Sequence, residues 1–293
     1  MYIPTALLGL LALSSSTFSA IAEPLPWDGR AEGLTVDSLS TKYVTKVLTQ
    51  RPGESKGSPA DYVTIKDDIR SPAYNGDKGV IDIGVNDKAM WGVEAYSRRS
   101  ELVQNISTNS TGSTFFRASI SKNNTFFYPY NWKVVFPKSQ LFEIHVDARS
   151  DFPSILFKTN GTKDAQWKVP FKLDTWYNFG IGMKAADGGK GTELEFYTST
   201  GDKDLVLNTT TKFASALPSS IEMHWGLLTQ VKQSKTATGP QMTEKQEIFS
   251  FSGVSAEGQV QTAAVVKTPG KSASSVAGEA KEFHQTDQKS FTF

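Results

Sequence analysis

The stretch LFEIHVD, residues 141–147, places three ionisable side chains at alternate positions. Successive side chains of a β-strand point to opposite faces, so Glu143, His145 and Asp147 project together while the apolar residues between them face a core. A carboxylate, an imidazole and a second carboxylate on one face form either a solvated outer surface or the floor of a site.

A second stretch repeats this spacing. In IEMHWGLL, residues 221–228, Glu222 and His224 are two positions apart, with Gly226 on the same face of the expected strand. A single Glu-x-His pair most often belongs to a solvated face, where charged pairs across strands stabilise a sheet by about 0.2–1 kcal/mol. Its repetition favours a shared site, but the pattern alone leaves both interpretations open.

The stretch MWGVEAYSRRSELV, residues 90–103, adds further carboxylates. If it forms one regular strand, Arg99 and Glu101 share a face and Glu94 lies on the other, so the two carboxylates cannot both face one cleft without a β-bulge. The neighbouring Arg99 favours the ionised form of Glu101, which suits a base. Glu143, which lies between apolar residues, is then the candidate proton donor if it is desolvated.

Paired carboxylates on a sheet face are what glycoside hydrolysis requires. One carboxyl group protonates the leaving oxygen, and the other activates water or attacks the anomeric carbon. Aromatic side chains are a second indication, because sugar rings stack on aromatic faces. Trp91, Tyr130 and Trp132 are candidates for a binding cleft, whereas Trp176 is expected to pack in a core.

The elements that must position these residues are short β-strands. From Pro24 to about Gly258, turn clusters separate short alternating or aromatic-rich runs, and no helical pattern alternates with them. This pattern predicts an all-β domain over residues 23–258, a β-jelly roll or concanavalin-like antiparallel β-sandwich. The spacing of apolar residues predicts a helix within residues 34–50. The expected strands are Gly79–Val85, Met90–Val103, Ser113–Ile120, Tyr130–Phe136, Leu141–Ala148, Ser154–Phe157, Trp176–Lys184, Thr192–Thr198, Ile221–Thr229 and Glu247–Val254.

The two ends of the chain differ from this domain. Residues 4–22 form an apolar run that closes on Ala20-Ile21-Ala22, so we expect residues 1–22 to be a signal peptide and the protein to be secreted and extracellular. Residues 259–293 are rich in small and polar residues and are expected to form a disordered tail. N-x-[ST] sequons agree with secretion and should lie at the surface if they are used: Asn105, Asn109, Asn123, Asn160 and Asn208.

Charge and composition argue against several classes of function. Lys+Arg 31 and Asp+Glu 30 nearly balance over 293 residues, which supports binding neither to nucleic acid nor to an anionic membrane. Cysteine is absent and only three histidines are present, so disulfides are impossible and a structural zinc site is not expected. We expect a monomer without a cofactor. Jelly rolls often hold a structural calcium ion, but Asp67, Asp68 and Asp82 are too generic to nominate as its ligands.

Several motifs resemble the catalytic domain of glycoside hydrolase family 131, whose members are fungal secreted β-glucanases with a β-jelly-roll fold. The resemblance covers residues 24–258 and rests on WDGR (27–30), RRSEL (98–102), NWKVVFP (131–137) and TWYNFGIGM (175–183). RRSEL also resembles the R-[ST]-E-L strand of alginate and glucuronan lyases, which use a neighbouring Q-I-H strand. Here that strand reads Glu143-Ile144-His145, and Glu in place of Gln supplies the second carboxylate that a hydrolase requires.

The resemblance implies an enzyme that hydrolyses β-1,3-, β-1,4- or β-1,6-linked glucans. Its catalytic pair would be Glu101 and Glu143, on adjacent strands and facing each other across one sugar-sized gap. We expect an inverting reaction, in which a water molecule is held between carboxyl groups about 6.5–9.5 Å apart. The expected substrate-binding residues lie around this pair: Arg99, His145, Trp91, Tyr130, Trp132, Glu222 and His224.

Two other functions stay open at this point. The first is a polysaccharide lyase of the alginate or glucuronan lyase type, in which His145 and either Tyr130 or Tyr177 would act as base and acid. Such enzymes cleave uronic acids and need several basic groups along the cleft. The second is a non-catalytic jelly-roll protein that binds glucan through its aromatic residues and releases no reducing sugar.

Overall fold

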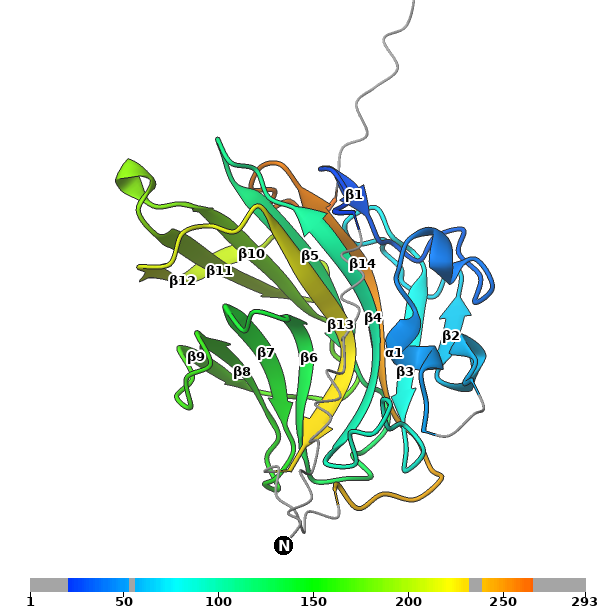
Figure 1. Ribbon diagram of the computed structural model, residues 1–293. Helices are drawn as coiled ribbons and strands as arrows, with labels where there is room; N and C mark the ends of the chain where they lie inside the picture. The colour runs from blue at the N-terminus through cyan, green and yellow to red at the C-terminus, as the bar shows by residue number, and fades with distance from the viewer. Residues whose placement is uncertain (1–20, 53–55, 232–238, 266–293) are drawn as a thin grey trace, which may run out of the picture.

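The computed structural model describes residues 21–52, 56–231 and 239–265. These residues form two antiparallel β-sheets that pack face to face (Figure 1), as predicted for an all-β sandwich of the jelly-roll type. Helical segments in the described residues are single turns: α1 (Lys46–Thr49) and 3₁₀ turns at Leu39–Thr41, Pro59–Asp61 and Asp187–Gly189. The helix expected within residues 34–50 is therefore reduced to two separate turns.

The larger sheet has eight strands. Its order is β12 (Val206–Phe213), β11 (Thr192–Thr200), β10 (Tyr177–Ala185), β5 (Thr114–Ser121), β14 (Glu247–Glu257), β3 (Val80–Val85) and β2 (Val63–Lys66), with β1 (Trp27–Asp28) paired to β14.

The smaller sheet has six strands, and Glu101, Glu143, His145, Glu222 and His224 all lie on it. Its order is β4 (Ser97–Ser107), β13 (Ser220–Gln230), β6 (Asn131–Pro137), β7 (Phe142–Asp147), β8 (Ser154–Thr159) and β9 (Trp167–Pro170).

Alternation divides the side chains of the six-stranded sheet between two faces. Leu102, Trp225 and Ile144 point toward the eight-stranded sheet and are buried in the core. The neighbouring residues of each strand point the other way, and we call this outward side of the six-stranded sheet the site face. It carries Glu101 of β4, His224 of β13, Lys133 of β6, and Glu143 and His145 of β7.

Two β-bulges adjust the strands beneath this face. The register shifts between Trp225 and Leu228 where β13 pairs with β6, and between Lys133 and Val135 where β6 pairs with β7. A bulge changes which residues of a strand face outward, and bulges are common beside active sites. Because of the second shift, Lys133 and Phe136 both line the site face although they are three positions apart.

The folded domain extends further toward the C-terminus than the sequence predicted. Residues 1–20 of the predicted signal peptide and residues 266–293 of the predicted tail lie outside the described residues. The folded part continues past residue 258, because Ala264 is only 4% exposed and its backbone bonds to Asn75 and Asp204. No helix among the residues that the structure describes is long and apolar enough to cross a membrane.

Candidate active site

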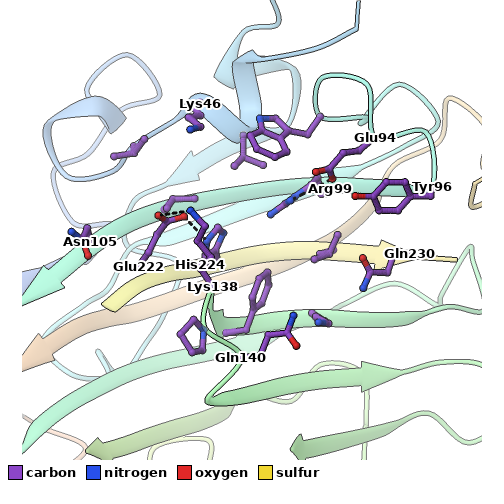
Figure 2. A pocket seen from close by; sticks show the side chains of 18 residues that line it. Lys46, Glu94, Tyr96, Arg99, Asn105, Lys138, Gln140, Glu222, His224 and Gln230 are labelled. Carbon is purple, nitrogen blue, oxygen red and sulfur yellow. Dashed lines mark hydrogen bonds and ion pairs between the residues drawn. The ribbon is translucent and has the colours of Figure 1, made fainter. Parts of the chain in front are cut away.

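A cleft of about 400 Å³ lies on the site face above β4, β13 and β6. Val44, Lys46 and Val47, at the start of α1, line one side, and Pro137, Lys138 and Gln140, at the turn between β6 and β7, line the other. Figure 2 shows two groups of charged side chains in this cleft: Glu222, His224 and Lys138 in one, and Glu94 and Arg99 in the other.

Glu101 lies beneath the cleft and is fully buried. Arg99 donates to both of its oxygens, from Nε at 2.8 Å and from Nη2 at 2.6 Å, and His224 Nδ1 lies 2.6 Å from Oε2. Burial alone would raise the pKa of Glu101, but the charge of Arg99 and the hydrogen bond to His224 outweigh it and lower the pKa. Glu101 is therefore an ionised carboxylate that solvent does not reach.

Gly226 allows β13 to pass this close to Glu101. The two residues are paired across the strands, and a Cβ at Gly226 would lie 2.2 Å from the carbonyl oxygen of Ser100. The φ angle of Gly226, +154°, also lies in a region that other residues rarely adopt. Glycine at this position therefore keeps the strand next to Glu101 in place.

His224 connects buried Glu101 to the cleft. Its Nε2 lies 3.2 Å from Glu222 Oε1, and its ring stacks on Phe136 with centroids 5.0 Å apart. Burial would lower the pKa of His224, but the hydrogen bonds to Glu101 and Glu222 outweigh it and raise the pKa. The protonated imidazolium form of His224 is thus favoured, with one nitrogen on a buried carboxylate and the other at the cleft.

Glu222 sits at the outer end of this chain of hydrogen bonds. The bond from His224 is the main cause that lowers the pKa of Glu222 to about 2, and Lys138 Nζ adds a contact at 3.2 Å. Its side chain is 37% exposed, in contrast to Glu101. Glu222 is therefore ionised and reachable from the cleft.

Glu143 forms a second ionised centre on β7. Lys133 Nζ lies 2.5 Å from Oε1, and His145 Nε2 lies 2.9 Å from Oε2. Burial opposes ionisation of Glu143, but the bonds to His145 and Lys133 outweigh it and lower the pKa. Burial is also the main cause of the lowered pKa of His145, whose Nδ1 lies 3.1 Å from Asn131 Oδ1.

The expectation that Glu101 and Glu143 lie on adjacent strands is wrong. Both lie on the site face, but β13 and β6 separate β4 from β7. At about 4.8 Å per strand, three steps place the two backbones about 14 Å apart. His224 is closer: it pairs with Phe136, the residue of β6 beside Glu143, so two steps or about 10 Å separate the backbones of His224 and Glu143.

Glu94 also lies elsewhere than alternation predicts. The strand β4 begins only at Ser97, and the chain before it turns back over the cleft, so the parity of a single strand does not apply. As a result Glu94 and Arg99 both line the cleft, with Nη1 and Oε2 3.6 Å apart. Tyr96, which was not among the sequence-predicted site residues, lines it as well.

The three predicted aromatic residues have different positions. Trp91 lines the cleft, and the charged groups of Arg99 and Lys46 lie 5.2 Å and 5.7 Å from its ring centroid. The prediction for Trp132 is wrong, because its side chain faces the core and is fully buried. Tyr130 is partly buried outside the cleft lining, and its hydroxyl donates to Gln241 O at 2.8 Å.

The tyrosines of the lyase interpretation do not meet His145 at this site. Tyr177 belongs to β10 of the other sheet, where it is 6% exposed and its hydroxyl donates to Pro170 O at 3.2 Å. Tyr130 is held by Gln241. The residues described here therefore give His145 neither of its predicted acid partners.

The predicted sequons differ in accessibility. Asn123, Asn160 and Asn208 are exposed. Asn109 is partly buried, and its Nδ2 donates to Gly258 O at 2.9 Å. Asn105 lies on the site face and lines the cleft, so a glycan attached there would enter the cleft.

Within the described ranges, no group of three or more histidine, aspartate or glutamate side chains is arranged to hold a metal ion. Lysines and arginines neutralise the carboxylates of the cleft instead. The chemistry that these side chains can supply is proton transfer, because an imidazolium and an ionised carboxylate face the same space.

Comparisons with known proteins agree with this architecture. The sequence profile of the glycoside hydrolase 131 catalytic N-terminal domain matches residues 25–262. A glycoside hydrolase family 131 β-glucanase catalytic domain from Podospora anserina superposes with a TM-score of 0.61 at 21% identity, covering 81% of this chain and 97% of its own. The family 131 catalytic domain from Coprinopsis cinerea gives 0.62 at 21% identity, with 82% and 96% covered. No curated protein sequence matches the chain. Because the profile spans most of its length, the chain belongs to glycoside hydrolase family 131.

Proposed function

We propose that the protein is a secreted, monomeric β-glucanase that hydrolyses β-1,3-, β-1,4- or β-1,6-linked glucans with inversion of configuration. Membership of a glycoside hydrolase family supports the reaction class, and a family 131 relative described as a β-glucanase supports the substrate. One observation carries the mechanism: the imidazolium of His224 lies on one side of Phe136, and the ionised carboxylate of Glu143 lies on the other.

In this mechanism the acid and the base come from different residue types. Glu143 accepts a proton from a water molecule while the water oxygen bonds to the anomeric carbon. The glycosidic C–O bond breaks, and its electron pair stays on the leaving oxygen, which takes the proton of His224 Nε2. Glu143 ends protonated and His224 neutral, and exchange with solvent restores both. Inversion requires about 6.5–9.5 Å between the acid and base groups, and a backbone spacing of about 10 Å between β13 and β7 is compatible with a separation in this range.

Glu101 acts through His224 in this proposal. Its oxygens are occupied by Arg99 and His224, and it is fully buried, so a sugar oxygen has no access to it. Its negative charge keeps His224 protonated and holds the ring in one orientation. Both predicted glutamates are then essential, Glu143 as the base and Glu101 as a positioning residue.

The test measures the products and the rates of three variants. Wild-type protein should release sugars of inverted anomeric configuration from defined β-glucan oligosaccharides, as followed by NMR. His224→Asn and Glu143→Gln should each lower kcat by about 10²–10⁴-fold, the usual contribution of a general acid or base. Glu195→Gln is the control, because Glu195 is also ion-paired but lies on the eight-stranded sheet.

Several results would contradict the proposal. Retained configuration excludes direct displacement of the leaving group by water and requires two successive displacements. Near-normal turnover in His224→Asn removes the imidazolium as the acid. An unsaturated product that absorbs in the ultraviolet would identify a lyase, and binding without release of reducing sugar would identify a non-catalytic glucan-binding protein.

A further inference from the structure

The site face continues beyond the cleft onto β8 and β9, and there it carries unpaired positive charge. Lys158 of β8 lies directly opposite Glu143, and Lys168 of β9 lies opposite Leu156. Directly opposed residues of antiparallel strands project from the same face. Both lysines therefore stand on the site face, on the side of Glu143 that points away from His224.

The other cations of the site face contact carboxylates. Lys133 binds Glu143 at 2.5 Å, and Lys138 binds Glu222 at 3.2 Å. In the described part of the chain, no carboxylate lies within ion-pair distance of Lys158 or of Lys168. The two lysines are thus unmatched charges, as is Lys46, which lines the cleft and contacts the ring of Trp91.

The nearest carboxylates have other partners. Glu143 is held by Lys133 and His145, and Asp147 is held by Arg149 at 2.7 Å. Arg149 is the main cause that lowers the pKa of Asp147, and Lys158 contributes to this lowering from a distance. The positive field of Lys158 therefore reaches the site, although the protein supplies no anion of its own to neutralise it.

A neutral glucan carries no negative charge that the unpaired lysines could bind. The chain as a whole carries a formal net charge of only +1. The cations beside the reacting carboxylate therefore do not reflect a generally basic protein surface. Leu156 is adjacent to both lysines on this face but is only 7% exposed, so the aliphatic stems of the lysines supply most of the apolar surface for a sugar ring. A ring with a carboxylate at its edge matches this combination.

We propose that β8 and β9 form a subsite for an acidic sugar, so that the enzyme prefers β-linked glucans that carry carboxylates, such as glucuronic acid units. Lys158 and Lys168 bind the carboxylate of the sugar one or two units from the cleaved bond. The inference rests on the proposed function, since it places the subsite relative to Glu143.

The experiment compares two oligosaccharides of equal length and linkage, of which one has C6 of its glucose units oxidised to carboxylate. Equilibrium binding is measured by calorimetry at low salt with His224→Asn protein, which leaves Glu143 and its ion-pair partner Lys133 unchanged. We expect the acidic ligand to bind roughly three- to tenfold more tightly, as two partly exposed ion pairs allow. The preference should shrink as salt is added.

Two lysine variants and one control decide the outcome. Lys158→Met and Lys168→Met, each made in the His224→Asn background, should reduce the preference, and together they should abolish it. Lys190→Met should keep it, because Lys190 is exposed near the turn that joins β10 and β11 of the other sheet. A preference that survives in the double variant, or equal binding of both ligands, overturns the acidic subsite. Cleavage of the neutral ligand by His224→Asn would instead overturn the proposed function.

Discussion

The substitution Glu101→Gln tests the central feature of the site, a buried charge that acts through a histidine. Glutamine keeps the size of the side chain but removes the negative charge that Arg99 and His224 share. Without that charge, burial dominates the pKa of His224 and lowers it. We expect the imidazole to be neutral at pH 7 in the variant.

The loss of activity and the shift in pH dependence follow from this change. A lost general acid costs about 10²–10⁴-fold in kcat. In the wild type the raised pKa keeps His224 charged at low pH, and activity should fall as the pH rises through that pKa, above the ordinary value of 6.5. In the variant the basic limb should move to lower pH, because the pKa of His224 falls.

The free energy of unfolding of the Glu101→Gln variant should fall as well. Breaking a buried ion pair by removing one partner costs about 3–5 kcal/mol, because the remaining charge of Arg99 stays buried. For a domain of this size, each kcal/mol corresponds to about 2–4 °C, so Tm should fall by about 6–20 °C. Glu195→Gln removes a partly exposed ion-paired carboxylate and should change Tm by much less.

Imidazole NMR provides the direct assay, because the chain has only three histidines. The resonance of His224 is assigned from its absence in His224→Asn, and its titration is compared between wild type and Glu101→Gln. A clear fall in its pKa, together with the shifted basic limb of kcat, supports the mechanism. An unchanged titration and an unchanged basic limb would refute the idea that Glu101 sets the charge of His224.

Three further predictions concern neighbouring residues. Glu143→Gln should abolish the acid limb of kcat, which in the wild type lies below 4.5 because the pKa of Glu143 is lowered; a pH profile of residual activity checks this. Glu222→Gln should move the basic limb to lower pH by less than Glu101→Gln does, because Glu222 is partly exposed; the same profiles compare the two shifts. Trp132→Ala should cost about 3–5 kcal/mol in denaturant unfolding, whereas Trp91→Ala should chiefly raise KM.

The orientation of the reactive side chains could be predicted from the sequence because alternation is local. Glu143 and His145 share a face, as do Glu222 and His224, and the apolar residues between them reach the core. Each of these stretches lies within one regular strand, where a period of two decides which side a residue takes. The composition of short runs and turns likewise predicted the all-β sandwich.

Strand order could not be predicted in the same way, because it depends on contacts between distant parts of the chain. Glu101 belongs to a strand whose neighbour, β13, begins more than a hundred residues later, and nothing in RRSEL specifies that pairing. The other errors have separate causes. The irregular turn before Ser97 brings Glu94 to the cleft. The burial of Trp132 agrees with the alternation of Asn131 and Lys133 with Trp132 and Val134, whereas its prediction as a cleft residue followed from its aromatic type.

Exposure distinguishes three carboxylates that the sequence presents as equivalent. Glu101 is fully buried, the side chain of Glu143 is 6% exposed, and that of Glu222 is 37% exposed. Each is ionised and each is next to a histidine, so charge alone does not separate their roles. A fully buried carboxylate can act only on its neighbours, whereas Glu143 keeps a small exposed area beside Lys133, which lines the cleft. In the proposed mechanism this difference assigns Glu101 to setting the charge of His224 and Glu143 to accepting a proton from water.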